Sequence, residues 1–216
     1  MPTLLMSKCK LFIFIFSLIL ISSCYKSSTP NKTAGFVGDY SLLKPLNNDI
    51  KTLFYQNKNA TKEQYHSIII HPVTIFFLED SKNKHLKQED LTKLGEYFKR
   101  EMTEVVKNKF KIVDKPGPGV LRLRTALIDI RATDVVANII SKTLFYLPVD
   151  MGEAAMEGEI RDSETGELLA AIVDRKIGTL FSPSLGYTKW GHVKDAFEDW
   201  ADQLDHVIER KYQPPK

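Results

Sequence analysis

Residues 153–177 read EAAMEGEIRDSETGELLAAIVDRKI and predict a β-hairpin, the element around which we expect the sheet to form. The polar stretch 162–167 is the turn, and Gly166 can take the positive φ that a short turn requires. With Asp162 opposite Glu167, the pairs on one face are all apolar or small: Ile160 with Leu169, Gly158 with Ala171, and Met156 with Val173. A shift of one residue would mix the two faces, so this register is the predicted one.

The other face of the hairpin carries Glu157 and Glu159. Residues 120–131 predict a long strand in which Arg122 and Arg124 share one face. If this strand lies beside the hairpin, the arginines can meet the glutamates across the sheet. We interpret these residues as a solvated charge ladder in which each ion pair contributes little stability. The alternative is an interaction surface, in which the arginines recognise an anionic lipid head group or glycan.

Two segments have the periodicity of amphipathic helices. Apolar residues spaced by three and four predict helices over residues 88–109 and 188–211. The first apolar stripe is Leu91, Leu94, Phe98, Met102 and Val105, and the second is Val193, Phe197, Trp200, Leu204 and Val207. Thr188 can cap the second helix with its side chain. Because each helix has one apolar face, we expect both helices to pack on the same face of the sheet.

The remaining strands are predicted at residues 65–78 and 110–113. Pro72 removes a donor from the ladder of hydrogen bonds and predicts a bulge or an edge. In the long strand the apolar positions change parity after Leu127, which predicts a second bulge. Residues 44–64 are expected to be irregular. The predicted fold class is therefore α+β, with a mostly antiparallel sheet of four to five strands and two long helices packed on one face.

The stretch GFVGDYSLL at residues 35–43 is expected to begin the folded domain. It lacks the Lys-Ser/Thr ending of a phosphate-binding loop, and no predicted strand precedes it. We therefore interpret this stretch as an apolar foot, meaning that the side chains of Phe36, Tyr40 and Leu43 pack the start of the domain against its core.

The N-terminus predicts a secretory signal peptide. Lys8 and Lys10 precede an apolar run of 11 residues, from 11 to 21, which is shorter than the roughly 20 residues that cross a bilayer. The exit ISSC resembles a bacterial lipobox, which implies that Cys24 is acylated and becomes the first residue of the mature chain. The alternative is a plain buried cysteine after an uncleaved helix. The predicted organisation is a signal peptide at 1–23, a lipidated cysteine and tether at 24–34, one periplasmic α+β domain at 35–212, and a tail at 213–216.

Acylation of Cys24 would place the protein in the cell envelope. Several acyl chains, palmitate among them, anchor a protein stably to a membrane. Tyr25 is not the aspartate that retains many lipoproteins in the inner membrane, so the resemblance favours the outer membrane, with the domain on its periplasmic face. The ten residues of the tether after Cys24 span at most about 35 Å. The expected partners are the membrane, through the lipid on Cys24, and an envelope protein.

Composition narrows the functional classes further. The formal net charge is +3, and removing Lys8 and Lys10 with the signal peptide lowers it to about +1. Such a balanced charge argues against a nucleic-acid-binding protein, which would show a basic face. The two cysteines are Cys9 and Cys24, so the folded domain is expected to contain neither a disulfide nor a cysteine zinc site.

No catalytic, metal or cofactor motif is found. The sequence has no nucleophile elbow, zinc-protease helix, phosphate loop or dinucleotide fingerprint. Its five histidines do not occur at metal-ligand spacing on one element: His66, His71, His85, His192 and His206. Asp162, Glu164 and Glu167 could hold calcium, but a polar hairpin tip explains them better. Glu153, Glu157 and Glu159 could act as paired acids, but alternation along a strand explains them better. No catalytic residue and no cofactor is predicted.

Residues 134–149 are apolar without a clean period. The first interpretation is a buried connection or short helix that covers the sheet. The second is an exposed flap that contacts lipid or a partner. In the second case the interaction surface consists of Val135, Ile139, Leu144, Phe145 and Tyr146, together with Arg122 and Arg124.

Four motifs together resemble a known family. They are GFVGDYSxL at 35–43, PGPGVLRLR at 116–124, ExEIxDSxTGELLAAxxD at 157–174, and Trp190 followed by FxxWA at 197–201. This set resembles the bacterial lipoproteins grouped as domain of unknown function 3313, over nearly all of the mature chain. The resemblance implies an envelope lipoprotein and carries no catalytic residue with it.

Three functional hypotheses follow. The first is a non-enzymatic outer-membrane lipoprotein that serves as a structural or binding module. The second is a hydrolase of cell-wall or lipid material that uses glutamates, which requires two carboxylates converging in a concave site. The third is an envelope assembly or transport factor that docks through residues 135–149.

Overall fold

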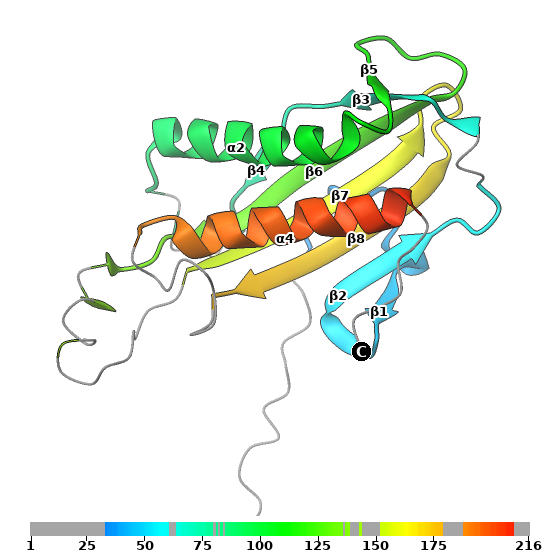
Figure 1. Ribbon diagram of the computed structural model, residues 1–216. Helices are drawn as coiled ribbons and strands as arrows, with labels where there is room; N and C mark the ends of the chain where they lie inside the picture. The colour runs from blue at the N-terminus through cyan, green and yellow to red at the C-terminus, as the bar shows by residue number, and fades with distance from the viewer. Residues whose placement is uncertain are drawn as a thin grey trace, which may run out of the picture.

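The structure, a computed structural model, has one layer of β-sheet and one layer of helices (Figure 1). It describes residues 33–60, 64–79, 81, 83, 85–135, 137–138, 143, 152–178 and 188–209. The strands are β1 Lys44–Leu46, β2 Asp49–Gln56, β3 Ser67–Ile70, β4 Thr74–Phe76, β5 Lys111–Ile112, β6 Val120–Arg131, β7 Glu153–Asp162 and β8 Leu168–Ile177. The helices are α2 Gln88–Val106 and α4 Gly191–Ile208, preceded by the short 3-10 helix η2 Tyr40–Leu42.

The sheet is mixed and contains eight strands in the described part of the chain, in the order β1-β2-β8-β7-β6-β3-β5, with β4 also paired to β6. The expectation of a mostly antiparallel sheet of four to five strands was therefore wrong, although the α+β class is confirmed. Pairing is antiparallel from β1 to β6, whereas β3 and β4 run parallel to β6, and β5 runs parallel to β3. The physical reason is the helix α2, which returns the chain across the sheet after β4, as parallel neighbours require.

Two strands lie in the segment that was expected to be irregular. β1 and β2 form an antiparallel hairpin at the sheet edge, joined by Asn47 and Asn48. These residues have φ angles of 51° and 64°. Asparagine tolerates this left-handed region, and two such residues in a row are typical of the turn that joins short hairpins. The Asn47-Asn48 pair is therefore a turn signal within the segment expected to be irregular.

Both predicted bulges are confirmed. Strand pairing with β6 stops after β3 and resumes at β4, so residues 71–73, which include Pro72, interrupt one edge. The pairing of β6 with β7 shifts between Ile128 and Arg131, and Asp129 has a φ of 56°. The shift brings Ile130 into the same hydrophobic core as Leu127, and Ile128 is also fully buried, which explains the change in apolar parity.

The turn of the β7–β8 hairpin is confirmed, but the register beyond it is not. Gly166 has a φ of 73°, and the Asp162 amide donates to the Glu167 carbonyl at 3.0 Å. Between Ile160 and Arg161 the register shifts by one residue. The resulting pairs are Ile160 with Ala170, Gly158 with Ile172, and Met156 with Asp174. The physical reason is that β7 is buried on both faces from Ala154 to Ile160, so a shift by one residue exposes no apolar side chain to solvent.

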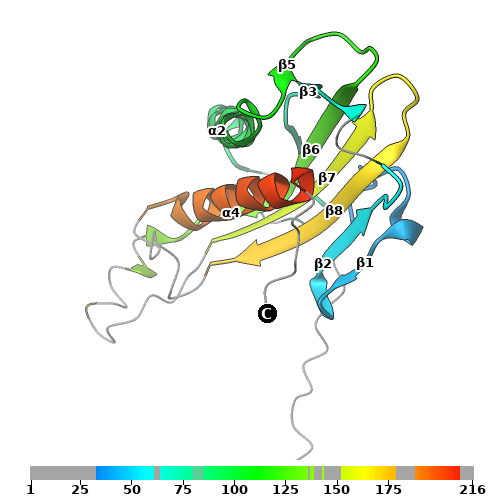
Figure 2. The same cartoon turned by 45° about the vertical axis from the view of Figure 1, so that its right-hand side comes forward.

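Both helices cover the same face of the sheet, as predicted (Figures 1 and 2). They run side by side in the same direction, because Lys189 pairs with Asp90 at one end and Lys109 pairs with Asp205 at the other. No helix in the described residues combines the length and hydrophobicity needed to cross a bilayer. The helix α4 begins at Gly191 and has no side-chain cap, so the predicted cap by Thr188 was wrong.

Three aromatic side chains join the helices to each other. Phe98 of α2 stacks on Phe197 of α4, with ring centroids 4.7 Å apart, and Trp200 lies 5.7 Å from Phe98 and 6.0 Å from Phe197. All three side chains are at most 2% exposed. They form the centre of the larger hydrophobic core.

The opposite face of the sheet is covered by residues 34–43, which we call the N-terminal strap. Val37 and Leu43 of the strap pack against Ala171 and Val173 of β8. The four buried side chains form a second, smaller hydrophobic core. Phe36 packs edge-on against Phe76 of β4, with ring centroids 6.2 Å apart. The interpretation of residues 35–43 as an apolar foot is confirmed in outline, with Val37 as a further anchor that the sequence reasoning did not include.

Candidate functional site

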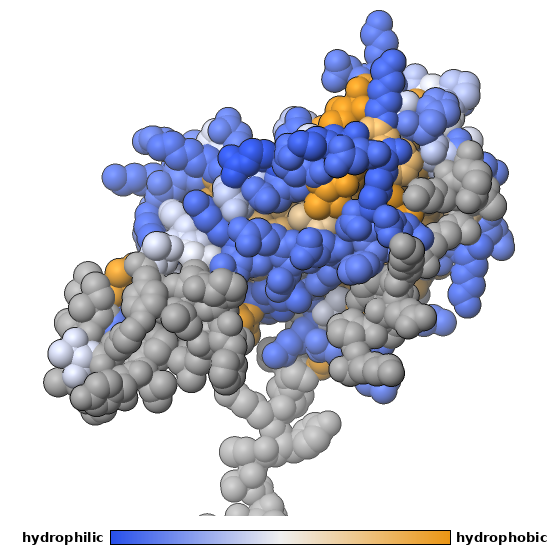
Figure 3. All heavy atoms as spheres, viewed as in Figure 1, coloured by the Kyte–Doolittle hydropathy of each residue, from blue (hydrophilic) through white to orange (hydrophobic). Residues whose placement is uncertain are grey.

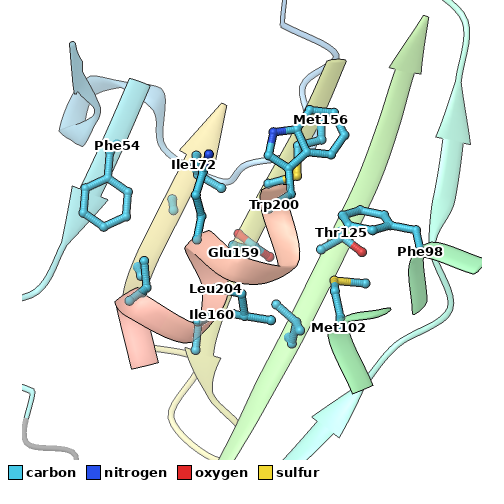
Figure 4. Close-up of a pocket in the computed structure, with 16 residues that line it drawn as sticks. Phe54, Phe98, Met102, Thr125, Met156, Glu159, Ile160, Ile172, Trp200 and Leu204 are labelled. Atoms are coloured by element: carbon cyan, nitrogen blue, oxygen red, sulfur yellow. The ribbon is translucent and has the colours of Figure 1, made fainter. Parts of the chain in front are cut away.

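An apolar pocket lies between the two helices and the sheet (Figure 4). Its volume is about 50 Å³, and its walls include Phe98 and Met102 of α2 and Trp200 and Leu204 of α4. A second pocket of about 60 Å³ adjoins it. The two pockets share three wall residues: Ile160, Ala170 and Val207. Both pockets are lined by residues from the C-terminal half of α4.

Gly158 of β7 is one of the residues that line the first pocket. Gly158 lies between Thr125 on β6 and Ile172 on β8. A Cβ atom at this position would lie 3.4 Å from the Ile172 Cγ2 atom and 3.6 Å from the Thr125 Cγ2 atom, which are ordinary contact distances. Glycine inside a strand is otherwise unfavourable, since it increases the entropy lost on folding. A Cβ atom at position 158 would therefore be in van der Waals contact with both neighbouring strands.

Two polar atoms in the pocket wall lack hydrogen-bond partners among the described residues. They are the Oγ1 atom of Thr125 and the Oε1 atom of Gln203, and both are buried. Thr125 is only 3% exposed. An unpaired buried polar group costs about 1–3 kcal/mol. This apolar pocket therefore contains two groups that could still form hydrogen bonds.

Replacing Thr125 with valine is expected to raise the free energy of unfolding by about 1 kcal/mol, because valine has the same shape and removes the unpaired hydroxyl. Thr133→Val is the matched control, since Thr133 is also buried and its Oγ1 atom accepts a hydrogen bond from the Gly152 amide at 3.0 Å. That variant is expected to lose about 1–2 kcal/mol. Urea unfolding followed by circular dichroism measures both values. Equal losses in the two variants would contradict the assignment of an unpaired hydroxyl.

The indole of Trp200 is held in the pocket wall by a buried carboxylate. The Trp200 Nε1 atom donates to Asp174 at 2.7 Å, and the Thr52 hydroxyl donates to the same carboxylate at 2.6 Å. Asp174 is 1% exposed, and the Lys176 ammonium lies 3.7 Å from it. The indole N–H of Trp200 and the Asp174 carboxylate are therefore both paired.

On the other face of the sheet, Glu157 binds the N-terminal strap. Its carboxylate accepts hydrogen bonds from the amides of Ala34 at 2.6 Å, Phe36 at 3.0 Å and Val37 at 3.2 Å, and from the hydroxyl of Tyr40. The Glu157 side chain is fully buried. Burial and the bond to Glu157 raise the pKa of Tyr40 to about 12, which keeps the phenol protonated as a donor. A single carboxylate thus fixes the first described residues of the domain.

Glu159 forms a second buried carboxylate cluster beside the strap. It bonds Arg124 at 2.7 Å and Arg161 at 2.9 Å, and it is 1% exposed. The predicted meeting of Arg124 with a glutamate is confirmed, but the interpretation as a solvated ladder was wrong. The Glu159 carboxylate is buried, although the Arg124 side chain remains 43% exposed, and Phe36 of the strap lies against the Arg124 guanidinium, with 4.7 Å between the guanidinium carbon and the ring centroid. Arg122 forms no ion pair with a glutamate among the described residues, and it donates to the Ser163 carbonyl at 3.1 Å.

The glutamates are engaged in binding other protein groups. Glu157 accepts the strap donors, Glu159 binds two arginines, and Glu153 pairs with Arg175 and lies 3.9 Å from Arg131. The hydrolase hypothesis requires two free carboxylates that converge on a concave site. These three residues do not provide that arrangement.

The histidines and acidic residues considered above as possible metal ligands lie in separate places. The part of the chain that the structure describes contains no group of three or more potential metal ligands. The Nδ1 atom of His66 lies 2.9 Å from the Ser67 hydroxyl, while burial, with the charges of Arg122 and Arg124 nearby, lowers the pKa of His71. Asp162 accepts the amides of the hairpin turn, which explains the acidic tip without calcium.

Most of the predicted apolar interaction surface lies outside the described residues, as does the lipidation residue Cys24. This applies to Ile139, Leu144, Phe145 and Tyr146. Val135 is described and is half-buried. The exposure of residues 135–149 therefore stays a prediction.

Sequence reasoning missed the pocket and the role of Glu157. A signal existed for the pocket: Gly158 occupies the middle of a strand, and Thr125 occupies an apolar position between Leu123 and Leu127. The role of Glu157 could be sought only through the strap, where several backbone amides within a few residues donate to one acceptor. Its acceptor lies more than 100 positions later in the chain, so local patterns could not connect the two.

One family model, described as a protein of unknown function (DUF3313), matches residues 32–204. The chain belongs to this family. The match confirms the resemblance stated from the four motifs. The DUF3313 region includes the strap, the β7–β8 hairpin and most of the pocket wall, ending at Leu204 of α4. No curated protein matches the chain in sequence.

Several solved structures are similar to this DUF3313 chain at low sequence identity. The PelC dodecamer from Paraburkholderia phytofirmans is 8% identical, covers 71% of this chain and 96% of its own, and has a TM-score of 0.42. The hypothetical protein CT253 from Chlamydia trachomatis is 9% identical, with coverages of 67% and 98% and a TM-score of 0.41. A putative neuraminyllactose-binding hemagglutinin homolog from Helicobacter pylori is 8% identical, with coverages of 72% and 94% and a TM-score of 0.38. These scores are low, and the similarities carry no argument about function.

Proposed function

We propose that this DUF3313 chain is a lipid-anchored lipoprotein of the bacterial outer membrane that acts in the periplasm as a non-enzymatic binding module. Cys24 carries the lipid, and residues 25–33 link it to the folded domain. The N-terminal pattern of two lysines, a short apolar run and ISSC supports the anchor. The engagement of the glutamates by other protein groups supports a binding role over a hydrolytic one.

The observation that carries this proposal is the attachment of the strap to Glu157. The Ala34 amide donates to the Glu157 carboxylate at 2.6 Å, and Ala34 lies ten residues after Cys24. Ten residues span at most about 35 Å. A domain tied down at Ala34 would therefore stay close to the bilayer that holds its anchor, where it could bind membrane components or an envelope partner.

Labelled palmitate tests the anchor. Cells that express the wild-type chain are expected to incorporate the label into the protein, and Cys24→Ser is expected to abolish incorporation, because serine lacks the thiol that is acylated. Cys9→Ser is the matched control, since Cys9 lies within the predicted signal peptide and should not affect labelling. Density fractionation of the membranes should place the labelled protein with the outer membrane.

Two results would contradict the proposal. The first is labelling that persists in Cys24→Ser, and the second is a wild-type chain that remains unlabelled with residues 1–23 still attached. A pull-down from cross-linked envelopes, comparing the wild type with Cys24→Ser, then identifies partners that depend on the anchor.

A further inference from the structure

The sheet face that binds the strap carries most of the arginines of this chain. Strand alternation and register place five of the seven arginines on the same face as Glu157. We call these five residues the arginine face: Arg122, Arg124, Arg131, Arg161 and Arg175. The side chains of Arg124, Arg131 and Arg161 are 43%, 37% and 24% exposed. The strap therefore leaves positive charge of this face accessible to solvent.

The carboxylates on the same face lie deeper than the arginines. The side chains of Glu157 and Glu159 are at most 1% exposed, and that of Glu153 is 21% exposed. Arg122 of β6 and Arg161 of β7 lie directly opposite each other in the sheet. Like charges in such a pair destabilise an antiparallel sheet. An anionic surface outside this face would offset the repulsion between the arginines.

The other side of the sheet has the opposite charge. α2 contains three basic and five acidic residues, and α4 contains one lysine and five acidic residues, so their net charges are −2 and −4. Both helices pack on the face away from the strap, and hydrophilic residues cover much of their outer surface (Figure 3). An anionic surface would therefore attract the arginine face and repel the helices, and would meet the domain in one orientation.

The chain that leads from Cys24 to the strap adds positive charge. Lys26 and Lys32 are the charged residues between Cys24 and Ala34, whereas the strap itself contributes one acidic residue, Asp39. The Ala34 amide donates to Glu157 at 2.6 Å, so this basic segment ends on the same sheet face as the five arginines. Ten residues span at most about 35 Å, which keeps the arginine face within reach of a bilayer that holds Cys24.

We propose that the arginine face docks on the anionic lipid surface of the membrane in which Cys24 is anchored. Its guanidinium groups bind lipid phosphates, for which the planar fork of arginine is well suited, and the acidic helices point away from the bilayer. The inference rests on the proposed function for the anchor, and it adds the surface and the chemical class of partner.

Sedimentation with vesicles tests the docking without the lipid anchor. A protease site inserted after Cys24 releases residues 25–216 once the full chain has folded. The released domain is expected to sediment with vesicles of equal parts phosphatidylglycerol and phosphatidylcholine, and to stay in solution with phosphatidylcholine alone. Salt at about 1 M should abolish the binding, because it shortens the Debye length to about 3 Å.

Substitution of the most exposed arginines locates the binding surface. Arg124→Gln and Arg131→Gln should each weaken vesicle binding about fivefold, which corresponds to about 1 kcal/mol for one basic residue near an anionic surface. Arg131→Lys keeps the charge and should bind nearly as well as the wild type. Arg100→Gln is the matched control, because Arg100 is 61% exposed on α2 and should not contribute. If Arg124→Gln fails to fold, the two variants of Arg131 still decide.

Fluorescence quenching tests the orientation. The released domain contains no cysteine, so Ser41→Cys on the strap and Glu104→Cys on α2 each provide one labelling site. Both positions are exposed. With a fluorophore at these sites and vesicles whose lipid head groups carry a nitroxide, the label at position 41 should be quenched strongly and the label at position 104 hardly at all.

Three results would overturn the inference: equal binding to the two kinds of vesicle, an equal effect of Arg131→Gln and Arg100→Gln, or equal quenching at positions 41 and 104. The outcome is separate from that of the palmitate test. Selective vesicle binding by a chain that is not acylated at Cys24 would overturn only the proposed function. Normal acylation without selective vesicle binding would overturn only this inference.

Discussion

Glu157→Gln is expected to lower the free energy of unfolding by about 3 kcal/mol and to detach the strap from the sheet. The carboxylate accepts three backbone amides and the Tyr40 hydroxyl, all from residues 34–40. An amide of the same shape keeps one oxygen and turns an NH₂ group toward donors. Because one carboxylate oxygen accepts the Ala34 amide and the other accepts the remaining three donors, the NH₂ group would face at least one strap donor, and the remaining bonds would lose the negative charge that strengthens them.

Urea unfolding gives the loss of stability, and hydrogen exchange at the amides of Phe36 and Val37 reports the strap directly. Tyr40→Phe is the graded comparison, since it removes one of the four donors and should cost about 1 kcal/mol. Glu164→Gln is the surface control, because Glu164 is exposed in the hairpin turn, and its unfolding free energy should hardly change. If strap exchange rates stay at the wild-type level in Glu157→Gln, then the packing of Val37 and Leu43 alone holds the strap.

Phe197→Ala is the second large effect, with an expected loss of about 3–5 kcal/mol. Phe197 is completely buried, stacks on Phe98 and lies beside Trp200, so its removal leaves a cavity at the contact between the two helices. Phe76→Ala is the matched control. Phe76 is 37% exposed on β4, and its truncation should cost about 1 kcal/mol or less.

Thermal and urea unfolding of the two alanine variants check this prediction. The Trp200 fluorescence spectrum should shift to longer wavelength in Phe197→Ala and stay unchanged in Phe76→Ala, because only the first variant opens the environment of the indole. Similar losses in both variants would show that α2 and α4 are held to the sheet by contacts other than this aromatic cluster.

Local features of the fold were accessible from the sequence. The stripe of Phe98 and its neighbours predicted α2 because a period near 3.6 is a property of the helix itself. Gly166 predicted the hairpin turn, since few other residues adopt its positive φ. Pro72 predicted the interruption between β3 and β4, because proline cannot donate to a strand ladder. Each of these arguments involves residues close together in the chain.

The candidate site was accessible only in part. The sequence placed Arg124 and Glu159 on adjacent strands, and the structure joins them at 2.7 Å. It did not show that this face is buried, since alternation along a strand tells which residues share a face and not what covers it. The covering element, the strap, is separated from Glu157 by more than 100 residues. The predicted register of β7 and β8 was wrong for the same reason, because it depended on one face of the hairpin being exposed to solvent.

By itself, the sequence determined the α+β class, the two helices, the hairpin turn, both bulges and the family, because periodicity, turn chemistry and motif spacing are local properties. The tertiary structure alone decided the parallel pairing of β3 and β4 with β6, the burial of Glu157 beneath the strap, and the pocket beside Gly158. Burial and pairing depend on which surfaces meet, and the meeting partners here are distant in the chain. The strand pattern predicts that the Glu157 carboxylate is solvated. In the folded protein the strap covers this carboxylate, which accepts hydrogen bonds from residues 34–40.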